Sequence, residues 1–210
     1  MTDPGRHVFE TLDSRTVYDG AIVALRVDRV SMPGGETAER EVVEHHGAVA
    51  VVAVDTEDRL VLIHQYRHPV GRRLWEIPAG LLDVPDEAPH VAAARELAEE
   101  TGLGADRWSV LVDVMLSPGF TDEAVRIFLA EELHDVDRAD PEHEEADLDI
   151  DRIPVADAVS MALRGEIANA TAVAGIMALA GARSSVASLR PADAPWEGRP
   201  SRFGTRKAGR

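Results

Sequence analysis

Cysteine is absent from the 210-residue sequence. Disulfide bonds, thiolate nucleophiles and zinc sites built on cysteine are therefore excluded. No run of 18 uncharged apolar residues occurs, so no membrane-spanning helix is expected. Residues 1–10 carry charges and no apolar core, and from this we expect no export signal and a cytoplasmic protein.

Basic residues are few, with 22 Lys and Arg against 38 Asp and Glu and a net charge of −16. Nucleic-acid binding needs a basic surface and is not expected. The basic residues gather in segment 183–210, which contains seven of them and only two acids. The rest of the chain is so acidic that an anionic substrate requires metal cations or local arginines to reverse the field.

Valine-rich segments predict strands, and their order with the helices predicts the α+β class. Strands are expected at 20–32, 41–54, 59–66, 108–116, 124–131 and 150–155, and helices at 89–101, 155–164 and 168–182. The turn at 55–58 predicts that the strands flanking it form a hairpin, and Gly47 predicts a bulge or register break. The segment after Ser184 is compatible with disorder or with docking through Trp196 and Phe203.

Three glutamates share one face of the helix expected at 89–101. Glu96, Glu99 and Glu100 are spaced by three and four residues, and like charges at this spacing destabilise a helix. Magnesium, which prefers oxygen ligands, is one explanation for the arrangement, and a solvated acidic face is the other. Arg95 can pair with Glu99 one turn later. The preceding segment 75–80 leads from a strand into a glycine loop that brings backbone carbonyls toward the helix.

The order Glu87, seven residues and then Arg95-Glu96-Leu97-x-Glu99-Glu100-x-Gly102-Leu103 resembles the signature of the Nudix hydrolase family. The signature has five residues between its first glycine and first glutamate, whereas six separate Gly80 from Glu87 here. Asp86 stands at the strict spacing, so either acid can fill that position. We favour Glu87 because its distance to Arg95 matches the signature.

Pro118 lies fifteen residues after Leu103, within the segment 117–123. This spacing and the segments 65–67, 76–80 and 164–169 are similar to the ADP-ribose pyrophosphatase branch of that family, and to its actinobacterial type. The likeness runs from about residue 17 to residue 182. It implies an α/β/α Nudix sandwich with an N-terminal β lobe.

The resemblance implies roles for individual residues. The metal, Mg²⁺ with Mn²⁺ as the alternative, is expected to be bound by Glu96, Glu100, Glu99 and the carbonyl of Ala79. The acidic segment 131–151, in which 11 of 21 residues are acidic, supplies the group that activates water, for which we choose Glu145 with Glu144 as the alternative. Substrate contacts are assigned to Arg67, Glu123, Arg40 and Phe120, and supporting roles to Arg95, Glu87 and Gly80. A core position is the alternative for Phe120.

The implied activity is hydrolysis of ADP-ribose to AMP and ribose 5-phosphate. Hydrolysis of other nucleoside diphosphate sugars is an alternative, and a non-catalytic nucleotide sensor is another, although the intact set of glutamates argues against a sensor. The implied division is an N-terminal β lobe at 1–48, a catalytic domain at 49–182 and a basic tail at 183–210. The resemblance also implies a homodimer that exchanges its N-terminal lobe.

Overall fold

The computed structural model describes residues 6–137, 147–184 and 188–209. The chain divides into two compact units. The first, here called the lobe, consists of Met1–Gly47, Met115–Glu123 and Arg199–Arg210. The second, here called the sandwich, consists of Ala48–Val114 and Ala124–Gly198. Each unit therefore combines segments that are distant in the sequence.

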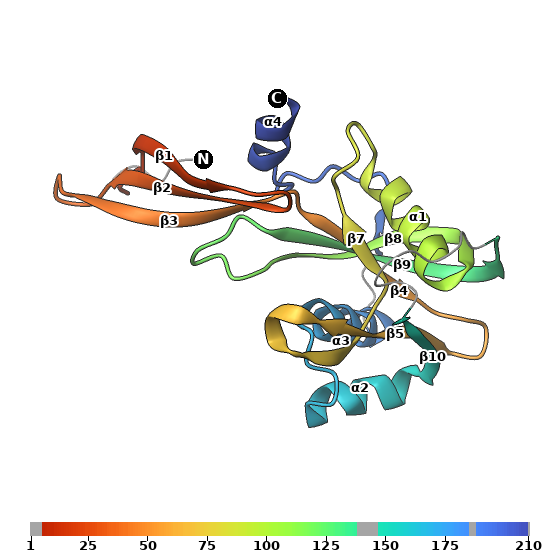
Figure 1. The fold of residues 1–210 in the computed structure, drawn as a ribbon. Helices are drawn as coiled ribbons and strands as arrows, with labels where there is room; N and C mark the ends of the chain where they lie inside the picture. Colours follow the sequence, from red (N-terminus) through yellow and green to blue (C-terminus); the bar gives the residue numbers. More distant parts are fainter. Residues whose placement is uncertain (1–5, 138–146, 185–187, 210) are drawn as a thin grey trace. The chain divides into compact units, whose positions relative to one another are not determined.

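The lobe is a three-stranded antiparallel sheet with one short helix. Its strands, in the order β1-β2-β3, are β1 (Thr11–Asp19), β2 (Val23–Ser31) and β3 (Thr37–His45) (Figure 1). The helix α4 (Arg202–Ala208) packs against β3. Sequence reasoning missed β1 and α4, because β1 is almost wholly exposed and lacks a regular apolar alternation.

The sandwich contains two sheets. The five-stranded sheet has the order β11-β8-β9-β4-β7, formed by β11 (Arg190–Pro191), β8 (Leu103–Met115), β9 (Ala124–Asp135), β4 (Ala48–Ala53) and β7 (Ala79–Leu81). The three-stranded sheet has the order β10-β5-β6, formed by β10 (Asp149–Pro154), β5 (Arg59–Arg67) and β6 (Arg72–Glu76). A short 3₁₀ helix, His68–Val70, joins β5 to β6.

Helices cover both faces of the five-stranded sheet. α1 (Pro89–Thr101) buries Ala92, Ala93 and Leu97 in one core cluster with Val49 and Val51 of β4. Successive side chains of a strand point to opposite faces, so Ala50 and Val52 of β4 face the other way. There α3 (Ala170–Ser184) packs on β4 and β9, and α2 (Val155–Arg164) packs on α3 (Figure 1). This arrangement confirms the predicted α+β class and α/β/α sandwich.

One predicted pairing is wrong. The turn expected at 55–58 is present, and a single bridge joins Val54 to Leu60 beyond it. The strands then diverge, because β4 pairs with β9 and β7 whereas β5 pairs with β10 and β6. The continuous strand expected at 41–54 is also divided at Gly47 (φ 79°) into β3 and β4, which belong to different units.

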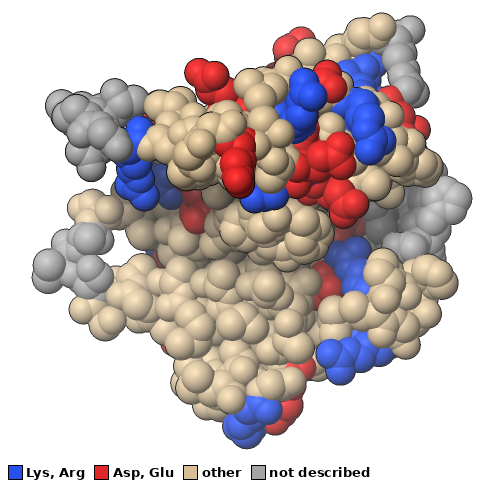
Figure 2. All heavy atoms as spheres, turned by 90° about the vertical axis from the view of Figure 1, so that its left-hand side faces the viewer, with Lys and Arg blue, Asp and Glu red and all other residues tan. Residues whose placement is uncertain are grey.

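The C-terminal segment docks through both aromatic residues proposed for it. The ring of Trp196 lies 4.9 Å from the guanidinium carbon of the buried Arg126, and Phe203 is fully buried in the lobe. No helix in the described part of the chain is long and apolar enough to cross a membrane. Figure 2 shows Lys and Arg side chains scattered among acidic and uncharged ones on the face that it presents.

Candidate functional site

The glutamate face is carried by α1, whose limits follow from local sequence signals. Pro89 occupies the first turn, where a missing N–H costs nothing. Gly102 ends the helix with φ 71°, a conformation that glycine adopts without a steric penalty, and its N–H donates to the carbonyl of Ala98 at 2.8 Å. The opposite side of α1 is held in the core by Ala92 and Leu97. The helix is thus fixed with its acidic side away from that core.

Arg95 connects the acidic groups on and before the helix. Its Nε and Nη2 atoms each donate to a carboxylate oxygen of Glu87 at 3.1 Å. Its Nη1 donates to Glu96 and to Glu99, both at 2.8 Å. Glu87, rather than Asp86, therefore forms the bidentate pair, as the sequence spacing to Arg95 favoured. The hydrogen bonds that Arg95 donates to Glu87, and the negative charges of Glu96 and Glu99, raise the pKa of Arg95 despite its partial burial.

The carboxylate of Glu96 lies directly against the backbone of β7. A Cβ atom placed on Gly80 would stand 1.9 Å from Cδ of Glu96 and 2.0 and 2.4 Å from its two oxygens. A side chain at this position would therefore displace the Glu96 carboxylate, and only glycine leaves it in place. The cradle holds a carboxylate whose side chain is only 14% exposed.

Glu100 lies against the neighbouring residue of the same strand. It is 7% exposed, and its Oε2 accepts a hydrogen bond from the backbone N–H of Ala79 at 3.0 Å. Two buried carboxylates from successive turns of α1 therefore contact consecutive residues of β7. The backbone of β7 and the glutamates of α1 therefore place carbonyl and carboxylate oxygens, which are hard metal ligands, next to one another.

The electrostatics of this face favour a cation. Burial raises the pKa of the Glu96 carboxyl, Arg95 opposes this shift, and the charges of Glu99 and Asp83 reinforce it. Within the described part of the chain, no three His, Asp or Glu side chains converge closely enough to hold a metal ion, because these carboxylates turn to Arg95 and to the Ala79 N–H. The donor types and the Gly80 cradle nevertheless fit a hard divalent cation, which takes carboxylate and carbonyl oxygens.

Arg67 is held by a buried acid that sequence reasoning did not single out. Its Nε and Nη2 donate to the two carboxylate oxygens of Glu76 at 3.1 and 2.7 Å, and Gln65 donates to the same carboxylate at 3.2 Å. The Glu76 side chain is 3% exposed, whereas that of Arg67 is 40% exposed. A guanidinium that is held by a buried carboxylate and is partly exposed suits an anionic ligand. The pairing joins β5 to β6, so no local pattern revealed it.

The other three predicted substrate residues belong to the lobe. Phe120 is 56% exposed, so the alternative of a core position is wrong. Oε1 of Glu123 lies 4.0 Å from Nδ1 of His45. Arg40 is exposed on β3 and donates to the Glu39 carbonyl at 2.9 Å.

The two candidates for activating water, Glu145 and Glu144, lie outside the described residues. Their assignment stays a prediction. The nearest described acids, Asp147 and Asp149, both pair with Arg73 of β6.

Comparison with known proteins gives a consistent picture. A family model described as a NUDIX domain matches residues 36–174, and a model described as the nucleoside diphosphate sugar hydrolase N-terminal domain matches residues 9–43. The chain is 52% identical over 204 residues to a protein of Mycobacterium tuberculosis named ADP-ribose pyrophosphatase, covering 97% of this chain and 99% of that protein. A Bacillus subtilis protein of the same name is 36% identical over 161 residues, covering 77% of this chain and 86% of the relative.

A solved structure supports the fold. The crystal structure titled as an ADP compounds hydrolase superposes with a TM-score of 0.74, covering 87% of this chain and 97% of the other, at 22% identity. At that identity the likeness concerns the fold alone.

Proposed function

This chain belongs to the Nudix family, and from that premise we propose that it hydrolyses the diphosphate bond of ADP-ribose to AMP and ribose 5-phosphate. The observation that carries the proposal is 52% identity, over 97% of the chain, to an ADP-ribose pyrophosphatase. The acidic face of α1, held against Gly80 and organised by Arg95, supports the hydrolytic part.

A divalent cation is the expected cofactor, as is general in this family, and we propose Mg²⁺, with Mn²⁺ as the alternative. Glu96, Glu100 and Glu99 are the proposed ligands, together with the carbonyl of Ala79. When bound, the ion offsets the phosphate charge and lowers the pKa of a coordinated water. That help matters because two unit charges 4 Å apart repel by about 4 kcal/mol at an effective dielectric near 20.

Side chains of this protein are proposed to bind the substrate and to accept the proton of the attacking water. Arg67, anchored on Glu76, is placed to bind an anionic oxygen of the diphosphate. Glu123 is proposed to accept a hydrogen bond from a ribose hydroxyl, and Arg40 to reach the substrate of the partner subunit. Phe120 is exposed and available to stack on the ligand. A carboxylate at Glu145, or else Glu144, takes the proton of the attacking water as the P–O–P bond breaks.

The test is the appearance of AMP and ribose 5-phosphate from ADP-ribose with Mg²⁺, followed by chromatography, with excess chelator as the first control. Glu100→Gln is expected to lower kcat/KM by more than about 100-fold, a loss of about 2.7 kcal/mol of transition-state stabilisation. Glu57→Gln, a charge-matched change at an exposed position, is the control variant. Near-normal turnover of Glu100→Gln would reject the metal assignment.

Other nucleoside diphosphate sugars are the second candidate class. The match of residues 9–43 to the N-terminal domain of nucleoside diphosphate sugar hydrolases favours this possibility. The acidic face of α1 serves either substrate, so the choice depends on the residues that contact the terminal sugar. Values of kcat/KM for ADP-ribose, ADP-glucose and GDP-mannose, measured on one preparation, separate the two candidates. A higher value for either sugar nucleotide would favour the second.

We also propose that residues 1–48 form an interface lobe and that the chain is a homodimer exchanging it. Exposed apolar side chains along and beside β1 support this, with 48–63% of their surface accessible: Val8, Phe9, Leu12, Val17, Tyr18 and Ile22. Exposed apolar side chains gathered on and beside one outer strand suit a protein–protein interface. Light scattering after gel filtration should give a dimer, and Val17→Glu should give a monomer. Arg29→Glu, which places the same side chain at an exposed site of β2, should remain dimeric. The expected cytoplasmic location stays a prediction.

A further inference from the structure

The helix α4 is bound to the end of β3 by one buried aromatic ring. Phe203 is fully buried and meets the ring of His46 edge to face, with centroids 4.5 Å apart at 82°. Nζ of Lys207 lies 4.9 Å from the centre of the Phe203 ring. A seven-residue helix has little stability by itself, so this packing is what keeps it in place.

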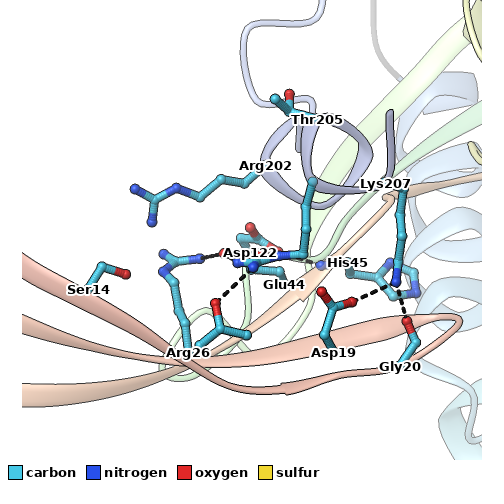
Figure 3. Close-up of polar contacts among 12 residues, drawn as sticks. Ser14, Asp19, Gly20, Arg26, Glu44, His45, Asp122, Arg202, Thr205 and Lys207 are labelled. Carbon is cyan, nitrogen blue, oxygen red and sulfur yellow. Dashed lines mark hydrogen bonds and ion pairs between the residues drawn. The ribbon is translucent and has the colours of Figure 1, made fainter. Parts of the chain in front are cut away.

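Ionic contacts reinforce the packing (Figure 3). Arg206 donates to both oxygens of Glu44, at 2.8 and 3.0 Å, and to the hydroxyl of Thr16 at 2.8 Å. Lys207 donates to Asp19 and to the carbonyl of Gly20, both at 2.6 Å. The helix therefore connects β1 to β3, the two outer strands of the lobe.

The contact between Arg206 and Glu44 matters for stability because Glu44 is buried. Its side chain is 0% exposed and is shared between Arg206 and Arg26, whose Nη1 donates to it at 2.8 Å. A buried carboxylate is tolerated only when it is paired and hydrogen-bonded. Loss of Arg206 leaves the buried Glu44 carboxylate with Arg26 as its remaining arginine partner, so part of its charge is no longer compensated.

The same strand holds the loop 117–123. The backbone N–H of Val43 donates to the Phe120 carbonyl at 2.8 Å, and the N–H of Asp122 donates to the Val43 carbonyl at 3.2 Å. The N–H of His45 donates to Oδ1 of Asp122 at 2.9 Å. Residues at the end of β3 and just beyond it thus alternate between two partners. The side chains of Glu44 and His46 meet α4, whereas backbone groups of Val43 and His45 bond the loop.

We propose that α4 is a positioning element for this loop, and that it acts on substrate binding through β3. By fixing Glu44 and His46 it sets the end of β3, and β3 in turn sets the Phe120 carbonyl and Asp122, the residue next to Glu123. The kinetic part of this proposal rests on the proposed function, in which Glu123 contacts ribose. The family match ends at residue 174, so α4 lies beyond it and its role does not follow from that match.

The principal test compares Arg206→Ala with Thr205→Ala. Thr205 is exposed on the same helix, and its hydroxyl bonds only locally, to the Ser201 carbonyl. Hydrogen–deuterium exchange is measured on peptides that cover 40–46, 115–123 and, as an internal reference, 89–101. In Arg206→Ala we expect faster exchange at the Val43 and Asp122 amides and unchanged exchange in α1, because the opening is local. Thr205→Ala should match the unsubstituted protein.

Kinetics with ADP-ribose supply the second readout. For Arg206→Ala we expect KM to rise about tenfold with kcat within about twofold, the pattern of a lost substrate-binding contact. Arg206→Lys, which keeps the charge and one donor, should recover part of the KM change. Phe203→Ala should repeat the Arg206→Ala result, and if it fails to fold, the two Arg206 variants decide.

The outcomes separate this proposal from the proposed function. Unchanged exchange in 115–123 overturns the positioning role whatever the substrate is. Exchange that rises equally in α1 also overturns it, because α4 then contributes only general stability. Faster loop exchange with an unchanged KM overturns the link to substrate. If the unsubstituted chain fails to hydrolyse ADP-ribose, the proposed function fails, while the exchange experiment still decides whether α4 positions the loop.

Discussion

Replacing Gly80 with alanine should disable the site without unfolding the protein. The new Cβ would stand 1.9 Å from Cδ of Glu96, so the carboxylate must retreat by about 1.5 Å to reach the 3.4 Å at which ordinary contact begins. The obstructing atoms are the end of a flexible side chain, which can rotate away. Backbone strain is not expected, because Gly80 lies in β7 without a left-handed φ.

The functional cost follows from that displacement. Metal–ligand distances tolerate only about 0.2 Å, and a misplacement of about 1 Å in a reacting assembly costs roughly 100-fold in rate. We therefore expect kcat/KM of Gly80→Ala to fall about 100-fold at fixed Mg²⁺, and the Mg²⁺ concentration for half-maximal rate to rise. The free energy of unfolding should change by less than about 1 kcal/mol, as for a change that only rotates the end of one flexible side chain.

The matched control is Gly181→Ala, in α3. Nothing lies within 4 Å of a Cβ at Gly181, and alanine in a helix is favoured over glycine by about 0.5–1 kcal/mol. This variant should keep full activity and be slightly more stable. If Gly80→Ala retained the kcat/KM of the unsubstituted protein at limiting Mg²⁺, Glu96 would not be a ligand, and the reasoning from the cradle would be refuted.

Three further predictions concern stability. Glu44→Ala leaves Arg26 and Arg206 without their shared acid and should cost about 3–5 kcal/mol in urea unfolding, the range for breaking a buried ion pair, whereas a change below about 1 kcal/mol would contradict the network. Burial alone would raise the pKa of Glu44 and of Asp28, but hydrogen bonds, including those from the arginines, outweigh it and lower both pKa values. The two carboxylates therefore stabilise the fold above their unfolded-state pKa, and this stabilisation is lost as the pH falls through the folded-state pKa. The thermal midpoint should fall more steeply below pH 5 in the unsubstituted protein than in Glu44→Gln. Trp196→Ala removes the ring over buried Arg126 and should cost about 2 kcal/mol, as expected for a desolvated cation–π contact. Urea unfolding followed by the fluorescence of the remaining Trp75 and Trp108 measures this cost.

The glutamate face was predictable because its signals are local. The helix limits at Pro89 and Gly102 depend on the chemistry of those two residues, and the spacing of Glu96, Glu99 and Glu100 places them together on any α-helix. The i,i+4 pair of Arg95 with Glu99 is present for the same reason. Contacts between residues three or four positions apart on a helix can therefore be predicted from the sequence.

The prediction of a β4–β5 hairpin was wrong because strand pairing depends on residues that are distant in the sequence. A turn at 55–58 and two apolar strands are compatible with a hairpin, and the first bridge, Val54 to Leu60, does form. Beyond it, β4 is buried along all but its first residue and takes β9 as its parallel partner, which lies more than 70 residues later. The stabilisation from burying both faces of the sheet outweighs the advantage of pairing across a short loop. The periodicity of apolar residues does not indicate which distant strand becomes the neighbour.

The acidic face of α1 and its requirement for glycine at position 102 were determined by the sequence alone, because helix geometry turns spacing into position. The partners that complete the candidate sites were decided only by the tertiary structure. Glu76 beneath Arg67, Gly80 against Glu96 and Arg206 on Glu44 join residues that are 9, 16 and 162 positions apart. Such contacts form when strands and helices bury their apolar faces, and the polar groups then pair with whatever that burial brings within reach.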